Sequence, residues 1–198
     1  MMESALNQAF DTFRIEAESL AETAKVLDRE EMRRAVEALA KAERIAAAGC
    51  GHSGIACRHF AHLMCCVERP ARFLSPAEAV HGGLGYLHEG DVLVIVSRGG
   101  KTDELLPIVD VAKTKGATVI AVTEKLESPL AQLSDIKLKM AISRECDKYN
   151  CQGTTSFAVT NAIFDALQAA LLEYTEYKNE TFALIHPGGA VGKRLNNK

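Results

Sequence analysis

Residues 91–123, with the sequence DVLVIVSRGGKTDELLPIVDVAKTKGATVIAVT, decide the fold class of this 198-residue chain. They read as an apolar strand at 91–97, a loop with two glycines, a helix that stops at Gly116, and a second apolar strand at 117–123. Strands that are apolar on both faces are typical of a parallel sheet that helices cover on both sides. The segment therefore predicts an α/β protein.

The same alternation of strands and helices continues on both sides of this segment. The further elements are helices at 3–26 and 28–40, strands at 44–49, 71–75 and 136–142, a short helix at 128–134 and a long helix that begins at Thr154. Five strands with intervening helices predict a three-layer αβα sandwich around a five-stranded parallel sheet. We expect one domain with N-terminal helices at 1–42, an αβα core at 43–176 and a tail at 177–198.

Composition excludes several classes of protein. Hydrophobic residues make up 47% of the chain, charged residues 25%, and the net charge is −3, which is ordinary for a globular domain and argues against nucleic-acid binding through bulk basic charge. No apolar run approaches the roughly 18 to 20 residues of a membrane span, and the acidic N-terminus is unlike a signal peptide. We therefore expect a cytoplasmic protein with neither a nucleic-acid nor a membrane partner.

The six cysteines fit the same compartment, because a chain of this length without a secretory signal gives little reason for a disulfide framework. A zinc site built from Cys50, His52, Cys57, His59 and His62 is the alternative, but structural zinc usually shows paired ligands at fixed spacing, and no CxxC pair is present. We expect reduced, mostly buried thiols and no metal site.

Three polar loops follow strands and should meet at the carboxyl edge of the sheet, where open parallel sheets bind ligands. They are GCGHSG at 49–54, SRGGKT at 97–102 and SRECDKYNCQGTTS at 143–156. Their hydroxyls and backbone amides, at the starts of helices, could hold a phosphate. The candidate binding residues are Ser53, Ser97, Gly100, Lys101, Thr102, Thr154 and Thr155.

Simpler interpretations of these loops remain open. Each loop taken alone could be a tight turn with a capping hydroxyl. Gly49, Gly51 and Gly54 match a dinucleotide fingerprint in spacing, but the acidic residue expected about 20 positions later is missing. SRGGKT also lacks the four-residue spacer of a Walker A loop. Nucleotide binding is thus the minority interpretation.

Three residues near these loops could transfer protons. Glu104 should lie in the first turn of the helix after SRGGKT, and Glu145 should lie just past the last strand. His186 lies in the tail, where a histidine can give and take a proton near neutral pH. His52 and His81 are further candidates in glycine-rich loops. Each carboxylate could instead be a helix-favoured or solvated surface charge.

At these positions the chain resembles the sugar-isomerase (SIS) domain, in which the phosphate loop usually reads S-x-S-G-E-S/T. FALIHPGGAVGKRL at 182–195 is similar to the HPGGALG-R/K-R/K-L signature of the arabinose-5-phosphate isomerase (KpsF/GutQ) group. AEAVHGGLG at 77–85, which contains His81, resembles that group's G-E-A-x-H-G-D-L-G segment, and SPLAQLSD at 128–135 resembles a further one. The match covers almost the whole chain in order.

The resemblance implies a flavodoxin-like SIS fold and isomerisation between an aldose phosphate and a ketose phosphate through an enediol, without a cofactor. The family's catalytic residues correspond to His52, Glu104, Glu145 and His186, and His81 to a substrate-binding position. In the family the HPGG histidine completes the site of a neighbouring subunit. The resemblance therefore implies a homodimer or homotetramer with shared active sites and a phosphorylated sugar as the ligand.

The chain departs from the family at several of these positions. His52 stands where the family has a lysine, Gly99 and Lys101 replace a serine and a glutamate, and Ser75 stands where the family has a histidine implicated in metal or substrate binding. Longer members continue into paired CBS modules, so ending at Lys198 is expected to leave an isomerase domain without them. A non-catalytic sugar-phosphate sensor and an isomerase of another sugar phosphate remain the alternatives.

Overall fold

The computed structural model describes residues 1–196 and contains one five-stranded, all-parallel sheet in the order β2-β1-β3-β4-β5. The strands are β1 (Ile45–Gly49), β2 (Ala71–Phe73), β3 (Val92–Val96), β4 (Thr118–Thr123) and β5 (Ile136–Lys139). The α/β class and the five parallel strands expected from the sequence are confirmed.

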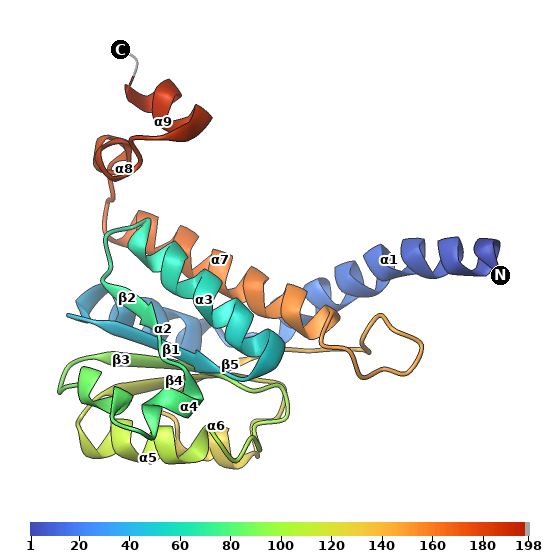
Figure 1. Ribbon diagram of the computed structural model, residues 1–198, viewed down its shortest axis with the longest axis horizontal. Coiled ribbons are helices and arrows are strands. Elements are labelled where there is room, and N and C mark those ends of the chain that lie inside the picture. The colour runs from blue at the N-terminus through green and yellow to red at the C-terminus, as the bar shows by residue number, and fades with distance from the viewer. Residues whose placement is uncertain (197–198) are drawn as a thin grey trace.

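Helices cover both faces of the sheet (Figure 1). One face packs against α2 (Arg29–Lys41), α3 (Gly51–Cys65) and α7 (Thr155–Tyr174), and the other against α4 (Pro76–Ala79), the 3-10 turn η1 (Gly83–Tyr86), α5 (Leu106–Thr114) and α6 (Pro129–Leu133). In β3, Val94 faces the first core and Leu93 the second, so successive residues serve opposite faces. This strand is apolar on both faces because each face packs against a core.

Helix α7 is the one helix of residues 1–196 whose length and hydropathy would also suit a membrane span. It lies against α1 (Met2–Val26), α2 and α3, and its residues Val159, Phe164 and Leu167 are buried in the first core. Its place in the fold is that of a core helix.

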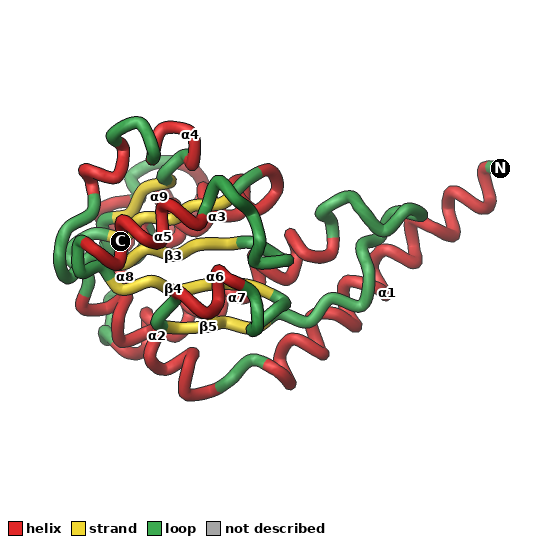
Figure 2. The backbone as a smooth tube through the Cα atoms, turned by 90° about the horizontal axis from the view of Figure 1, so that it is seen from below, coloured by secondary structure: helices red, strands yellow, loops and turns green. Residues whose placement is uncertain are grey.

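Helix α1 (Met2–Val26) projects from the body together with the loop before α7 (Figures 1 and 2). Only Ile15, Ser19 and Thr23 of this helix are buried. Thr23 exchanges hydrogen bonds with the backbone of Ala141, and Ser19 with Ser143. The inner half of α1 therefore fixes the chain that follows β5, while its outer half extends past the sheet.

The tail contains two helices that the sequence analysis did not predict, α8 (Asn179–Ile185) and α9 (Gly189–Asn196). They contact each other and stand apart from the sheet, on the side of the molecule away from the free end of α1 (Figure 1). Of the tail expected at 177–198, the last two residues lie outside the described residues.

Candidate functional site

The loops after β1 and β3 lie next to each other because the chain leaves β1 for β2 on one side and later returns as β3 on the other. Such a switch point opens a crevice outside the carboxyl ends of the strands. A cavity of about 520 Å³ occurs here, lined by the start of α3, the segment from Phe73 to Val80, and Glu104 with Pro107. The cavity marks the candidate site.

The first loop is tight because β1 turns directly into α3. A Cβ atom on Gly54 would lie 2.6 Å from the carbonyl oxygen of Gly49, so the strand and the helix approach each other more closely than a side chain allows. His52 and Ser53 lie in the first turn of α3 rather than in a free loop. The His52 ring is exposed and forms a T-shaped pair with Phe157 of α7, with the ring centroids 6.2 Å apart. A Cβ atom on Gly153 of the third loop would lie 3.3 Å from the His52 side chain, so His52 lies next to that loop.

The second loop closes on itself through hydroxyls. The side-chain oxygens of Ser97 and Thr102 are 2.9 Å apart, and the backbone amide of Gly100 donates to Ser97 Oγ at 3.0 Å. Lys101 is exposed beside them. Ser97, Gly100, Lys101 and Thr102 are thus brought together as the sequence predicts, in a form that offers hydroxyls, an amide turn and a cation.

Gly100 is the residue on which this loop depends. Its φ is +64°, and a Cβ atom would lie 2.0 Å from Ser128 Oγ at the start of α6. We expect Gly100→Ala to lower the free energy of unfolding by about 2 to 4 kcal/mol, from left-handed strain and overpacking together. Gly99→Ala is the matched control, because nothing lies within 4 Å of a Cβ at Gly99, and it should change stability by less than about 1 kcal/mol. Equal urea midpoints for the two variants would contradict this account.

The third loop places Glu145 in a buried network. Glu145 is 2% exposed, and its Oε1 accepts from Arg98 Nη1 at 2.7 Å. Its Oε2 accepts from the backbone amide of Ser156 at 3.1 Å and from the Thr154 hydroxyl at 3.4 Å. Both carboxylate oxygens are therefore engaged within the protein.

Thr155 has a different environment from Thr154. It is fully buried, and its hydroxyl lies 3.1 Å from Cys146 Sγ, so its side chain lies inside the fold in this structure and does not line the cavity. Thr154 is half-buried, donates to Glu145 and accepts from the backbone amide of Cys146 at 3.0 Å. The two threonines expected to act together thus face different surroundings.

Glu104 lies at the cavity but outside helix α5, which begins at Leu106 and not at residue 103 as the sequence suggests. Pro107 fits the first turn of a helix, and residues 103–105 form turns before it. Glu104 is exposed. Burial, followed by the negative charge of Glu104, raises the pKa of the Cys50 thiol. Cys50 and Glu104 both line the cavity.

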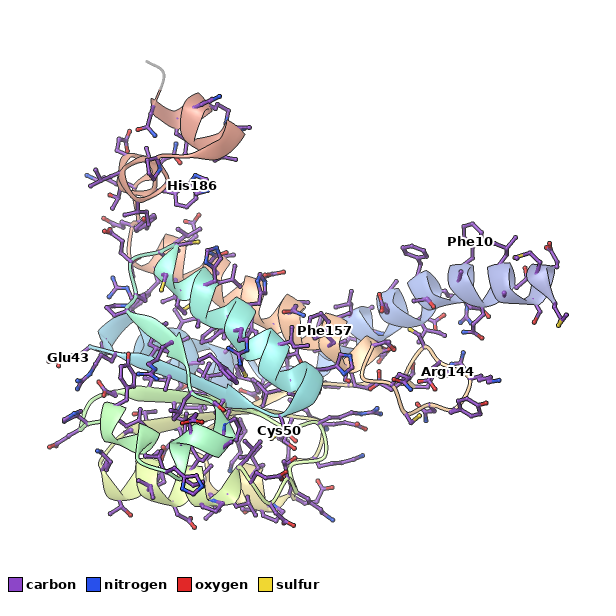
Figure 3. All side chains as sticks on the ribbon, viewed as in Figure 1. Phe10, Glu43, Cys50, Arg144, Phe157 and His186 are labelled. Carbon is purple, nitrogen blue, oxygen red and sulfur yellow. The ribbon has the colours of Figure 1, made fainter. Side chains whose placement is uncertain are left out.

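The remaining two histidines lie in different places. His81 is exposed directly after Val80, which lines the cavity. His186 ends α8 and packs against Phe182, with ring centroids 5.1 Å apart. Figure 3 shows His186 far from Cys50 and Phe157, which lie at the site. Within one chain, the tail histidine does not join the other candidates.

Two arginines at the site were missed by the sequence analysis. Arg58 lines the cavity and stacks on Phe73 at 4.0 Å from the ring centroid. Its spacing of four residues from Gly54 on one face of α3 is the signal that could have identified it. Arg98, within SRGGKT, contacts Glu145, and no local pattern indicates a partner 47 residues away.

All six cysteines are free thiols, but only Cys57 and Cys146 are buried, so the expectation of mostly buried thiols is wrong. Among residues 1–196, no three His, Cys, Asp or Glu side chains are grouped closely enough to hold a metal ion. The histidines of the zinc alternative have other contacts, since His59 lies 3.6 Å from Asp165 and His62 lies 3.7 Å from Cys66 Sγ.

Comparison with known proteins adds independent information. A family model described as the SIS domain matches residues 38–170. The arabinose 5-phosphate isomerase KdsD of Pseudomonas aeruginosa is 37% identical over 157 residues, which are 79% of this chain and 48% of that protein. The chain spans about half the length of the curated relatives it matches, between 45% and 60% for the arabinose 5-phosphate isomerases.

Two solved structures are also similar to this chain. A proposed sugar-phosphate isomerase of Listeria monocytogenes has a TM-score of 0.91 and 40% identity, covering 94% of this chain and 98% of that one. A protein of Escherichia coli CFT073 in complex with A5P has a TM-score of 0.87 and 26% identity, covering 93% of this chain and 98% of that one.

Proposed function

This chain belongs to the SIS-domain family, and we propose that it interconverts an aldose phosphate and a ketose phosphate, of the arabinose 5-phosphate and ribulose 5-phosphate type. The names of its relatives and the A5P complex of a structural neighbour support a phosphorylated sugar as the ligand. The observation that carries the proposal is the position of Glu104. This exposed carboxylate lines the cavity and lies just after the loop at 97–102, which we call the hydroxyl loop. A cytoplasmic location fits this chemistry.

In the proposed reaction, Ser97, Gly100, Lys101 and Thr102 bind the phosphate, and Glu104 takes the proton from the carbon next to the carbonyl. The electron pair of that C–H bond forms the double bond of an enediol, and the carbonyl oxygen gains a proton. Glu104 then returns its proton to the former carbonyl carbon while the other oxygen loses one. The two sugars are isomers, so atoms and electrons balance without a further reactant.

The other candidates have narrower proposed roles. His52 at the start of α3 is a donor beside the enediol oxygens, where the family has a lysine. Ser53 and His81 contact the sugar from the α3 and α4 sides. Thr154 and Thr155 stabilise the third loop through their contacts with Glu145 and Cys146. Glu145, whose oxygens are both engaged, becomes available only when one partner leaves.

The position of the tail supports a site that is shared between subunits. His186 lies away from Glu104 in its own chain (Figure 3), and Leu184 beside it is 77% exposed although apolar. We propose that the tail of one copy delivers His186 to the site of another, where it moves protons between the two sugar oxygens. A homodimer or homotetramer would satisfy this arrangement.

The test is incubation of the protein with five- to seven-carbon sugar phosphates in deuterated water. We expect the aldose and ketose phosphates to interconvert, with solvent deuterium appearing at the carbon next to the carbonyl. Stabilisation by a sugar phosphate without deuterium uptake would contradict an enzyme and establish a sensor that uses the same site. Activity on a six- or seven-carbon sugar phosphate alone would contradict the pentose assignment.

A further inference from the structure

Arg98 bridges two carboxylates on different elements. Its Nη1 donates to Glu145 Oε1 at 2.7 Å, and its Nε donates to Glu124 Oε2 at 2.9 Å. Glu145 follows β5 and is almost fully buried, whereas Glu124 follows β4 and is partly exposed. The Arg98 side chain itself is 33% exposed. It therefore has one buried partner, one partly exposed partner, and a part of its own surface that solvent or a ligand can reach.

Arg98 is also part of the hydroxyl loop. Its neighbours in the chain are Ser97, whose hydroxyl contacts Thr102, and Gly99. Its own carbonyl accepts from the backbone amide of Glu124 at 3.0 Å and from the Thr123 hydroxyl at 3.1 Å. The backbone of Arg98 is therefore fixed to the end of β4, while its side chain is held by its hydrogen-bonded ion pairs with Glu124 and Glu145.

We propose that Arg98 is an additional phosphate-binding residue, which Glu145 holds in the free protein and which transfers to the phosphate of a bound ligand. This proposal rests on the proposed function, because it takes the phosphate to bind at the 97–102 loop. A phosphate carries more charge than a carboxylate and offers several acceptor oxygens to the planar guanidinium fork. Because Arg98 belongs to the loop that binds the phosphate, only its distal nitrogens have to turn to reach the phosphate oxygens.

Glu124 anchors the stem of Arg98 during this exchange. Burial raises the pKa of Glu124, but hydrogen bonds from Arg98 and Lys125 outweigh burial and leave the pKa lowered. Glu124 therefore stays ionised and keeps Arg98 Nε in place. The distal Nη1 can then leave Glu145 without releasing the whole side chain.

Glu145 retains partners after Arg98 leaves. Its Oε2 still accepts from Ser156 N and the Thr154 hydroxyl, at the positive end of the 20-residue helix α7. Its Oε1 loses its donor and becomes free to accept a proton or a sugar hydroxyl. Binding of the phosphate would thus release the second carboxylate of the site, and only when a ligand is present.

This competition predicts a specific effect on ligand affinity. If Glu145 competes with phosphate for Arg98, neutralising Glu145 must strengthen phosphate binding, and it must do so only through Arg98. We expect Glu145→Gln to bind phosphate about tenfold more tightly than the wild type, and Arg98→Gln to bind it about tenfold more weakly. The double variant should bind like Arg98→Gln alone.

The experiment is isothermal titration of the four proteins with arabinitol 5-phosphate, which has no carbonyl and cannot isomerise, and with inorganic phosphate. Asp103→Asn, made in the wild-type and Arg98→Gln backgrounds, is the matched control, because Asp103 is an exposed acid of the same segment. Its removal should have the same small effect in both backgrounds. Thermal melts confirm that each variant is folded.

Two results would overturn the proposal. Equal tightening by Glu145→Gln with and without Arg98 would mean a general charge effect, and no tightening would mean that Glu145 does not compete for Arg98. Binding of the probes by a protein that takes up no deuterium would overturn the proposed isomerisation alone, and absence of the phosphate site at residues 97–102 gives a different pattern. Then the wild type binds neither probe and Ser97→Ala changes nothing, so the phosphate site itself is absent.

Discussion

Glu104→Gln should lower kcat for sugar-phosphate isomerisation by at least about 10³-fold, near the upper range for loss of a general base. The amide keeps the size of the side chain but cannot accept the proton from the carbon next to the carbonyl. KM and the affinity for arabinitol 5-phosphate should stay within about threefold of the wild type, because a group that acts mainly in the transition state contributes little to ground-state binding. Steady-state kinetics and titration measure the two quantities.

Deuterium uptake separates loss of the base from loss of the fold. The variant should take up no solvent deuterium at the substrate carbon while keeping the melting temperature of the wild type, since Glu104 is exposed. Asp103→Asn removes the same charge one residue earlier and should keep near-normal turnover. A Glu104→Gln protein with an unchanged rate would exclude Glu104 as the base and move that role to another carboxylate.

The sequence predicted most of the sheet because the strands that matter are apolar on both faces. Val92–Val96 and Thr118–Thr123 have no polar side that could face water, so two covering layers follow from the strands alone. The start of the helix at 28–40 is local as well, because Asp28 caps α2 by accepting from the amides of Glu30 and Glu31. Local chemistry decides both features.

The sequence did not predict which residues in the loops would meet. Arg98 follows β3 and pairs with Glu145 across 47 positions of the chain, so the pairing depends on how β3 and β5 are placed in the sheet. Thr154 and Thr155 look equivalent in the sequence, but successive residues at a helix start point about 100° apart. Only Thr154 therefore reaches Glu145, and Thr155 turns to Cys146. Contacts of this kind need the assembled fold.

His186→Ala should lower kcat by at least about 10²-fold. If the tail of another chain serves each site, mixing with Glu104→Gln chains should restore part of the lost activity. The structure favours this outcome because the tail is a defined unit turned away from its own site. A Cβ on Gly192 would lie 2.4 Å from the His186 carbonyl oxygen, so α9 folds closely back on the histidine. Figure 1 shows this unit apart from the sheet edge that bears the loops.

The two inactive proteins, unfolded together and refolded as an equimolar mixture, should recover about one quarter of wild-type activity, because a shared site draws each partner at random. Half of the sites would receive an intact Glu104, and half of those an intact His186. A mixture of Glu104→Gln with the double variant Glu104→Gln/His186→Ala is the negative control, since no chain in it carries Glu104. If mass spectrometry confirms mixed oligomers and the mixture stays inactive, the tail must act within its own chain, and α8 and α9 would have to fold back across α7 to reach the site.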